Sequence, residues 1–252
     1  MSSVSVAGLS VSFGPLEVLR DLSLDVADGE FVSILGPSGC GKSTTFSVLT
    51  GAVAPAAGSV AVDGRTVRRD DFAFMPQKDA LFPWRRILDN LTLGLEVSGM
   101  KRPAARSKVQ PLLEPFGLAG FERSYPWQLS GGMRQRAALL RTVVQERGVL
   151  LLDEPFGALD ALTRARMQRW VSSMWSEYGW TVLLVTHDVR EAVYLSDKIY
   201  VFSPRPATVV ECVPVSLPRP RDLGSPEFAA LEGKLLDLLL SEEDKVDADF
   251  AR

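Results

Sequence analysis

A glycine-rich segment that ends in a lysine and two hydroxyl residues is the first part of this chain whose composition and spacing could do chemistry. Gly36 and Gly41 bracket four residues, and a lysine and a serine follow at once. An apolar run at residues 31–35 precedes the segment, and a helical pattern at residues 44–49 follows it. In this setting, glycines let backbone N–H groups converge on phosphate oxygens, and the helix start adds its partial positive charge. We therefore expect a nucleoside triphosphate here, with a chance glycine-rich turn as the alternative.

The residues of this loop have distinct expected roles. Lys42 should reach the β- and γ-phosphates, and Ser43 should offer its hydroxyl to Mg²⁺. Cys40 is expected to serve as one small residue of the loop and not as a nucleophile. The residues expected to contact ATP are Gly36, Pro37, Ser38, Gly39, Cys40, Gly41, Lys42, Ser43 and Thr44.

Two adjacent acids, Asp153 and Glu154, follow the apolar run at residues 149–152. This pattern predicts a buried parallel strand that ends in two carboxylates. Asp153 could hold Mg²⁺ through its water shell, and Glu154 could orient and deprotonate an attacking water. The alternative is an acid pair that caps the next turn. An Asp-Glu-Pro sequence downstream of a phosphate-binding loop favours the catalytic interpretation.

Two further segments complete the set. Residues 129–136 predict the start of a helix, with Ser130 as N-cap and two glycines that expose backbone donors. His187 is the only histidine in the chain and follows an apolar run. In order and spacing, the four segments resemble the nucleotide-binding subunit of an ATP-binding cassette (ABC) transporter, over residues 4–213.

The resemblance implies roles that the residues alone would leave open. In the family, the segment at residues 129–136 is the signature, which covers the γ-phosphate of ATP bound on the other subunit. A head-to-tail homodimer with two ATP molecules between its subunits is therefore implied. His187 would contact the γ-phosphate and hold Glu154 and the water in line, whereas a lone histidine would otherwise often be structural. The signature residues implied to act across the dimer are Ser130, Gly131, Gly132 and Gln135.

Three more positions match the pattern of the family. Gln77 would touch Mg²⁺ and water and link the core to a helical subdomain. Phe13, which we place on the second early strand, would stack on adenine. Asp160 belongs to the loop that crosses the dimer interface. The alternatives are a surface glutamine, a core phenylalanine and a helix N-cap, respectively. The expected metal ligands are Ser43, Gln77 and Asp153.

The order of elements predicts an α/β fold, because several short apolar runs precede a turn and a helical pattern. We expect a P-loop NTPase of the ABC type, with a mixed parallel core sheet, an N-terminal antiparallel β subdomain and an inserted helical subdomain at about residues 81–147. The Asp-Gly turn at residues 27–30 is expected to join antiparallel early strands. The ATPase domain should span residues 1–213. The tail, residues 214–252, should contain one helix from about residue 226 to 240 and no regulatory domain. We expect the apolar face of that helix to pack on the core. The alternative is that this face binds a partner.

Composition narrows the class of protein. The 252 residues are 46% hydrophobic and 23% charged, with a net charge of −3. This suits one globular domain and gives no basic excess for binding nucleic acid. Two cysteines make neither a disulfide framework nor a metal quartet. No signal peptide and no run of ~20 apolar residues is visible, so we expect any membrane span to belong to another polypeptide.

Residues 78–90 and 156–164 resemble bacterial importer subunits, more narrowly the nitrate, alkanesulfonate and taurine group with its thiamine-precursor pyrimidine branch. This implies an ATPase that energises import through an integral-membrane permease, with an extracytoplasmic solute-binding protein, at the cytoplasmic face of the plasma membrane. Residues 82–84 would line the groove for the permease or pack within the subdomain. The alternative is a soluble ABC ATPase that acts on nucleic acid or ribosomes. The expected coiled coil or second cassette of such proteins is missing from the sequence.

Overall fold

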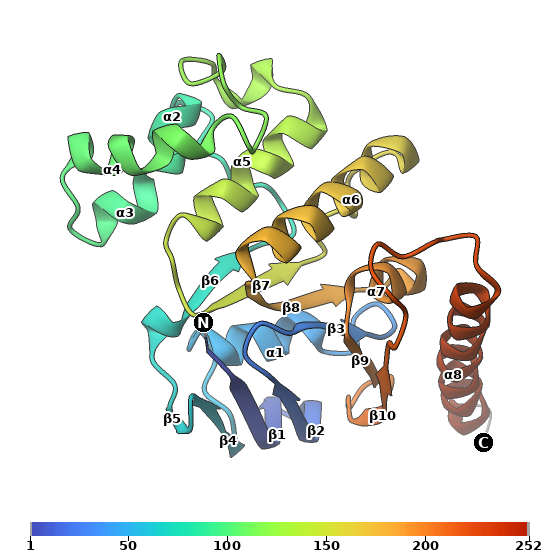
Figure 1. Cartoon of the computed structure of the whole chain (residues 1–252). Helices are drawn as coiled ribbons and strands as arrows, with labels where there is room; N and C mark the ends of the chain where they lie inside the picture. The colour runs from blue at the N-terminus through green and yellow to red at the C-terminus, as the bar shows by residue number, and fades with distance from the viewer. Residues whose placement is uncertain (1, 251–252) are drawn as a thin grey trace.

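Two β-sheets organise the chain (Figure 1). The computed structural model describes residues 2–250, apart from the side chains at 69 and 245–250. One sheet has four antiparallel strands in the order β2-β1-β4-β5. The other has six in the order β10-β9-β3-β8-β7-β6, of which β10 is antiparallel to β9 and the other five are parallel. The strands are β1 (Val4–Phe13), β2 (Leu16–Val26), β3 (Phe31–Leu35), β4 (Ala57–Val62), β5 (Arg65–Thr66), β6 (Phe72–Met75), β7 (Val149–Asp153), β8 (Thr181–Thr186), β9 (Lys198–Phe202) and β10 (Val209–Pro214).

Helices cover both faces of the six-stranded sheet. Helix α1 lies between the two sheets, and α5, α6 and α7 lie on the opposite face (Figure 1). Between β6 and β7 the described chain forms helices and turns without a strand. The helices are α1 (Lys42–Leu49), α2 (Ile87–Leu91), α3 (Leu93–Val97), α4 (Arg102–Val109), α5 (Gly131–Val143), α6 (Ala161–Tyr178), α7 (Val189–Leu195) and α8 (Pro226–Phe250), with short 3₁₀ turns at Arg69–Asp71, Gln110–Leu112 and Pro126–Gln128. The predicted α/β fold, with its mixed core sheet and antiparallel N-terminal sheet, is confirmed.

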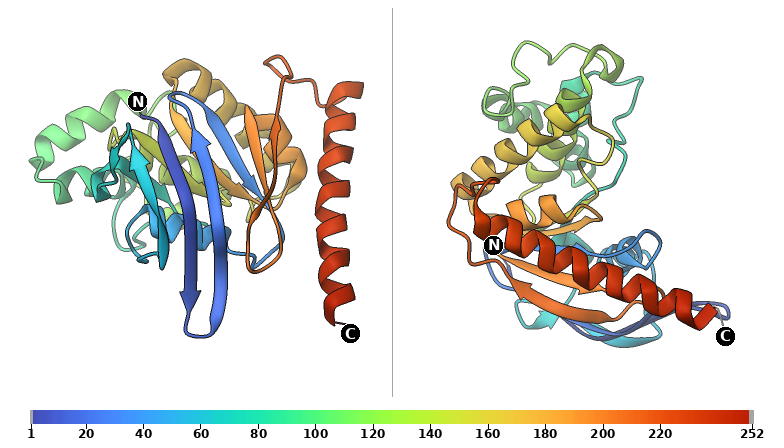
Figure 2. Two further views of the ribbon diagram at one scale, coloured as in Figure 1. Left: turned by 90° about the horizontal axis from the view of Figure 1, so that it is seen from below. Right: turned by 90° about the vertical axis from the view of Figure 1, so that its right-hand side faces the viewer.

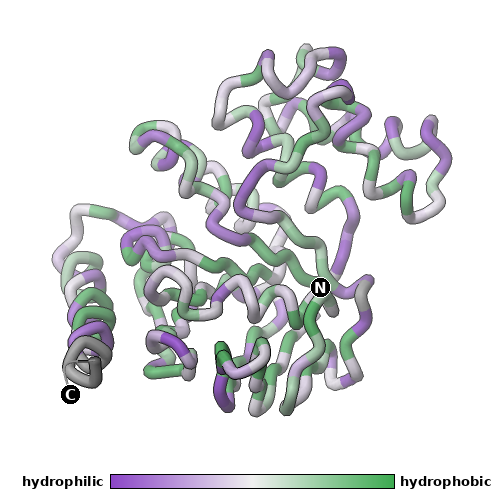
Figure 3. The backbone as a smooth tube through the Cα atoms, turned by 180° about the vertical axis from the view of Figure 1, so that it is seen from behind, coloured by the Kyte–Doolittle hydropathy of each residue, from purple (hydrophilic) through white to green (hydrophobic). Residues whose placement is uncertain are grey.

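Alternate residues of the central strands enter two hydrophobic cores. On β3, Val32 and Ile34 belong to the core shared with α1 and the four-stranded sheet. Phe31 and Leu35 belong to the core shared with α5, α6 and α7. All five residues of β3 are buried, as expected for a parallel strand with both faces covered. Figure 3 shows hydrophobic residues concentrated along the strands.

Two expectations about the first strands are wrong. Strand β1 continues to Phe13, which therefore ends the first strand and does not lie on the second. A positive φ of 61° at Gly8 and a register shift beside it let the strand bend and continue. The turn at residues 27–30 joins no hairpin, because β2 and β3 belong to different sheets. The antiparallel partner of β1 is β2, across the turn at Gly14.

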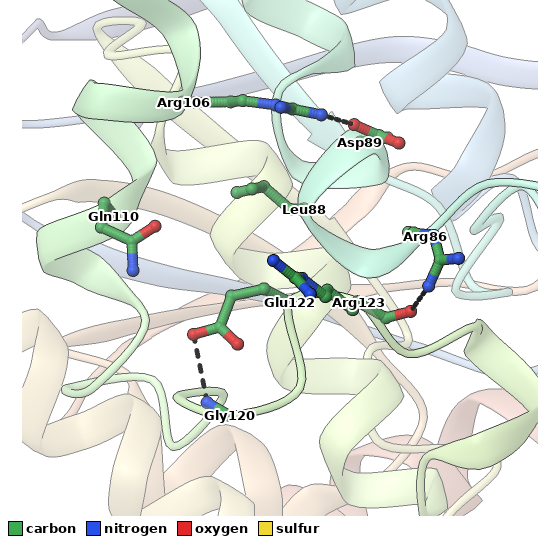
Figure 4. A pocket seen from close by; sticks show the side chains of 8 residues that line it. All are labelled: Arg86, Leu88, Asp89, Arg106, Gln110, Gly120, Glu122 and Arg123. Atoms are coloured by element: carbon green, nitrogen blue, oxygen red, sulfur yellow. Dashed lines mark hydrogen bonds and ion pairs between the residues drawn. The ribbon is translucent and has the colours of Figure 1, made fainter. Parts of the chain in front are cut away.

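Charged contacts hold the helical part together around a pocket of about 680 Å³ (Figure 4). Asp89 Oδ1 pairs with Arg102 Nη2 at 2.6 Å and with Arg106 Nη2 at 2.8 Å. Burial raises the pKa of Asp89, but hydrogen bonds from both guanidinium groups outweigh burial and hold the pKa below its usual range. Arg86 donates to the backbone oxygen of Arg123. These contacts tie α2 to α4 and to the chain that precedes α5.

Two tail arginines satisfy the carboxyl-terminal end of α7. Arg221 donates through Nη1 to the carbonyl oxygens of Val193 at 2.6 Å and Tyr194 at 3.0 Å. Arg219 donates to the carbonyl oxygen of Leu195 at 2.6 Å. The last carbonyls of a helix have no partner within it, so these contacts replace the missing ones. Burial lowers the pKa of Arg221 to about 10.

Helix α8 is longer than predicted and continues to Phe250. Figure 2 shows it alongside β10 at one side of the molecule. Phe228 and Leu235 are fully buried, so the prediction that its apolar face packs on the core is confirmed for this part of the helix. Leu236 and Leu240 remain exposed. In the described part of the chain, no helix is long and apolar enough to cross a bilayer.

Candidate functional site

The candidate site forms where neighbouring parallel strands end. Strands β3, β8, β7 and β6 are adjacent and parallel, so their carboxyl ends meet at one edge of the sheet. Lys42 follows β3, Glu154 follows β7, His187 follows β8, and Gln77 comes two residues after β6. Ligands of open α/β sheets bind outside this edge. The fold thus brings together four segments that are far apart in the sequence.

The phosphate-binding loop closely approaches β2. Gly41 has a φ of 132°, and a Cβ added there would lie 2.7 Å from Leu19 Cδ2, so a side chain is excluded on both counts. The buried Lys42 amine donates to the carbonyl oxygens of Gly36 and Pro37, each at 2.8 Å. A pocket of about 470 Å³ opens beside the loop. Its lining residues are Phe13, Leu16, Val18, Ser38, Gly39, Gly41, Lys42, Ser43, Thr44, Gln77, Glu154 and Arg205.

One part of this pocket is lined by apolar side chains, and the pKa of the neighbouring Cys40 thiol is raised. Phe13 is half-exposed and lines the pocket with Leu16 and Val18, which suits stacking on an adenine ring. Cys40 is buried, and burial raises the pKa of its thiol despite the opposing charges of Lys42 and Arg205. A raised pKa disfavours the thiolate. Cys40 therefore fills space in the loop, as expected from its small size.

The oxygen donors beside the pocket fit Mg²⁺. Ser43 Oγ donates to Asp153 Oδ1 at 3.2 Å, so a hydroxyl and a carboxylate adjoin each other next to the phosphate loop. The pKa of Asp153 is raised above its usual value, mainly because the carboxylate is buried. The hydrogen bond from Ser43 lowers this pKa, but its effect is smaller than that of burial. The described residues contain no group of three or more His, Cys, Asp or Glu that could cage a metal. Mg²⁺ needs none, because it is bound by one or two carboxylates together with substrate phosphates and water. Ser43 and Asp153 would hold Mg²⁺ there, and the ion would neutralise phosphate charge. Gln77 donates to Glu154, and its contact with the metal stays a prediction.

Glu154 lies at the centre of a three-residue cluster. Its Oε2 accepts a hydrogen bond from Gln77 Nε2 at 2.8 Å, and its Oε1 lies 3.2 Å from His187 Nδ1. Glu154 has a φ of 43°, in the left-handed region, and its backbone N–H donates to the oxygen of Val185 at 2.9 Å. Strained backbone of this kind is found at sites where a side chain must be aimed. The carboxylate is thus fixed on both oxygens at the mouth of the phosphate pocket.

The signature residues lie away from this pocket. Ser130 caps α5 by accepting a hydrogen bond from Met133 N at 3.3 Å, as predicted. Gly131 and Gln135 line a second pocket of about 550 Å³, which shares Gln77 with the first. A Cβ at Gly132 would lie 2.9 Å from Thr163 Cγ2, so a glycine is needed where α5 meets α6. Within one chain, the structure therefore does not bring the signature to the phosphate loop.

The interface-loop residue has a structural partner within the chain, whereas the buried oxygen of the signature glutamine has none among the described residues. Asp160 is the N-cap of α6 and accepts a hydrogen bond from Thr163 N at 3.0 Å. Gln135 is buried, and its Oε1 has no hydrogen-bond partner among the described residues. The N-cap alternative for Asp160 is correct, and a role at a dimer interface stays a prediction.

Sequence reasoning missed two residues near the site. Arg205 lines the phosphate pocket from the loop between β9 and β10, and no local pattern marks it. Glu191 is 4% exposed on α7, four residues after His187. Because Glu191 comes three residues after the N-cap Asp188, the sequence places it in the first turn of a helix. The sequence does not show that its side chain is buried.

Comparisons with known proteins agree with this geometry. The family model described as ABC transporter matches residues 19–157, more than half of the chain. The chain belongs to the ABC transporter family of ATP-binding proteins. It is 42% identical, over 96% of this chain and 86% of the relative, to an aliphatic sulfonates import ATP-binding protein, SsuB 2, of Pseudomonas aeruginosa. It is 41% identical, over 82% of each chain, to a taurine import ATP-binding protein, TauB, of Yersinia pestis.

A solved structure resembles this ABC ATPase closely. The dimeric post-hydrolysis structure of the ATP-binding cassette MJ0796, bound to ADP and phosphate, superposes with a TM-score of 0.72 at 28% identity, over 84% of this chain and 98% of that one. Membership of the family makes the chain an ATP-binding protein and an ATPase. The pocket beside the phosphate loop is the place in this structure that suits ATP.

The buried Glu191 of this ABC ATPase should make its stability fall with rising pH. Burial raises the pKa of Glu191 to about 8, and the nearby charge of Asp188 adds to the shift. Gln168 Nε2 donates a hydrogen bond to Glu191 Oε2 at 3.4 Å, and Arg164 is the neighbouring cation. Between the ordinary value of 4.5 and about 8, the unfolded state has lost a proton that the folded state keeps, so the free energy of unfolding decreases as pH rises. As pH rises from 4.5 to about 8, we expect the melting temperature of Glu191→Gln, measured by calorimetry, to fall less than that of the wild type.

An exposed glutamate supplies the control for that measurement. Glu177→Gln on α6 removes one carboxylate from the surface and should follow the wild-type pH profile. Parallel profiles for the wild type and Glu191→Gln would contradict a protonated Glu191.

Proposed function

We propose that this ABC ATPase energises the import of a small anionic solute, a sulfonate or a taurine-like compound, through a separate permease. The observation that carries the proposal is similarity over nearly the whole chain to proteins named for the import of aliphatic sulfonates and taurine. The ATPase domain would be residues 1–213, with a helical subdomain at residues 81–147 and the tail at 214–252. It would act at the cytoplasmic face of the plasma membrane, with an extracytoplasmic binding protein delivering the solute.

The dimer part of the proposal rests on the separation of the two halves of the site. The phosphate loop and the signature line different pockets of one chain. A second copy in head-to-tail contact would place its signature over the first copy's phosphate loop, as the dimeric state of the similar cassette suggests. Mg²⁺ would accompany each ATP at Ser43 and Asp153. His187 and Gln77 would hold Glu154 on the attacking water.

Exposed apolar residues on both sides of Gln77 in the sequence suit contact with the permease. Phe82 and Trp84 are exposed, and their rings contact each other with centroids 5.3 Å apart. Phe74 and Val97, also exposed, line a groove of about 880 Å³ between β6 and α3. Monomeric proteins seldom expose several large apolar side chains together without a partner. A permease loop would therefore bind at these exposed residues, three of which, Phe74, Phe82 and Trp84, lie within seven positions of Gln77 in the sequence.

Uptake measurements in a deletion strain of the encoding organism test this function. Loss of the gene should abolish uptake of labelled taurine or an alkanesulfonate, and the wild-type gene but not Glu154→Gln should restore it. Uptake of nitrate and of a thiamine-precursor pyrimidine should be measured in parallel, because a selective loss of either would reassign the solute. Unchanged uptake of all four solutes would contradict the proposed import function.

A further inference from the structure

The loop between β9 and β10 lies against the phosphate-binding loop. Arg205 donates through Nη2 to the carbonyl oxygen of Gly39. A Cβ added at Gly36 would lie 3.1 Å from Phe202 Cβ, which shows how closely the end of β9 approaches the start of the phosphate loop. Arg205 therefore reaches the ATP pocket from an element that carries none of the phosphate motifs.

Backbone hydrogen bonds fix this loop to the strand that forms the apolar end of the pocket. Ala207 is fully buried, its N–H donates to the oxygen of Val18 at 2.8 Å, and its oxygen accepts from Arg20 N at 3.0 Å. Ser203 Oγ accepts a hydrogen bond from Thr208 N at 3.0 Å and so closes the loop on itself. The base of the Arg205 side chain is thus held between β2 and the phosphate loop.

The charge of Arg205 has no acidic partner among the described residues. A guanidinium group has five N–H donors, and the contact with Gly39 uses one Nη atom. Arg205 lines the same pocket as Lys42, and the remaining ionisable residue that lines this pocket is Glu154. Guanidinium groups bind phosphate oxygens with charge-assisted hydrogen bonds. We propose that Arg205 is a nucleotide-contacting residue, which binds the phosphate chain of ATP in addition to Lys42; the proposal rests on ATP occupying this pocket.

Binding of fluorescent ATP and ADP analogues to purified Arg205 variants tests the proposal. Arg205→Gln should weaken ATP binding by about tenfold, as expected for the loss of a charge-assisted hydrogen bond at a partly exposed site. Arg205→Lys should lie between this variant and the wild type, because it keeps the charge but not the planar fork. The KM for ATP should rise by a similar factor, while kcat at saturating ATP should stay within about twofold of the wild type, because the contact is formed in the ground state.

Arg20→Gln is the matched control. Arg20 is an exposed arginine two residues from Val18, its partner is Glu17, and it does not line the pocket. This variant should bind ATP as the wild type does. The melting temperature of each ligand-free variant should also be measured, because a guanidinium group that only braced Gly39 would lower it.

The outcomes separate this proposal from its rivals. Weaker ATP binding with an unchanged ligand-free melting temperature and less salt sensitivity than the wild type supports a phosphate contact. Unchanged ATP affinity in Arg205→Gln overturns it. Weakened binding accompanied by an equal loss in Arg205→Lys and by a lower melting temperature also overturns it, in favour of bracing. If Lys42→Ala loses ATP binding and Arg205→Gln does not, ATP binds in this pocket but Arg205 does not contact it.

Discussion

Replacement of Glu154 by glutamine is expected to leave ATP binding intact and to lower ATP turnover by roughly 10²-fold or more. Both carboxylate oxygens are held, one by Gln77 at 2.8 Å and the other beside His187 at 3.2 Å. The amide keeps the shape of the carboxylate but cannot accept a proton from the attacking water. An interaction that acts only in the transition state affects kcat and leaves ground-state binding in place.

Steady-state hydrolysis and nucleotide binding should be measured on the same preparation. Lys42→Ala is the contrasting variant, because its loss removes a cation that faces the phosphates in the ground state and should weaken ATP binding. Glu177→Gln, an exposed carboxylate far from the cluster in sequence, should hydrolyse ATP at the wild-type rate. A Glu154→Gln enzyme that turned over at that rate would exclude Glu154 as the general base.

The same variant should accumulate as an ATP-bound dimer. Two nucleotides between two subunits bind both phosphate loops and both signatures only while the γ-phosphate remains, so blocked hydrolysis shifts the population to the dimer. Light scattering with Mg-ATP measures this directly. A Glu154→Gln protein that stayed monomeric at high protein concentration, with ATP bound, would count against the shared arrangement.

Local patterns were sufficient for the residues that follow strands. Asp153 ends an apolar run, His187 directly follows another, and Lys42 opens the helix after the loop that follows a third. Parallel strands place such residues at one edge of the sheet. The cap at Ser130 was likewise predictable, because an N-cap depends on residues within three positions of it. Each of these features is local, or follows from the direction of the strands.

The features that the sequence did not predict depend on segments that are far apart in the chain. An Asp-Gly turn specifies a reversal of the chain but not whether the strands on either side pair. The hairpin predicted at residues 27–30 is therefore wrong, because this turn links two sheets. The end of β1 at Phe13 depended on a bend at Gly8. The approach of Arg205 to Gly39 bridges 166 positions in the sequence and is set by the pairing of residue 207 with β2. No window of neighbouring residues contains that information.

A test with mixed dimers addresses the division of labour between the subunits. Among the described residues, the pocket beside Lys42 is lined by no signature residue, so we expect Lys42 and Ser130 to serve the same ATP from opposite subunits. A Lys42→Ala chain keeps an intact signature, and a Ser130→Arg chain keeps an intact phosphate loop. Each homodimer should be nearly inactive, because each of its two sites lacks one half. The replacement of Ser130 also removes the cap on Met133 N, so the folding of that variant should be verified by its melting temperature.

In a verified heterodimer of the two variants, one composite site combines the good phosphate loop with the good signature, and the other carries both defects. Hydrolysis should return to a measurable rate if one intact site suffices, and at most to about half of the wild-type rate, since one of two sites is complete. Trapping of a single ATP per heterodimer should be measured as well, because strong coupling between sites could suppress turnover without preventing occupancy. Heterodimers that neither hydrolyse nor trap ATP would refute the shared site. A chain that worked alone would show itself differently: Ser130→Arg would then leave hydrolysis almost untouched, because the arginine would lie outside the pocket that binds and cleaves its own ATP.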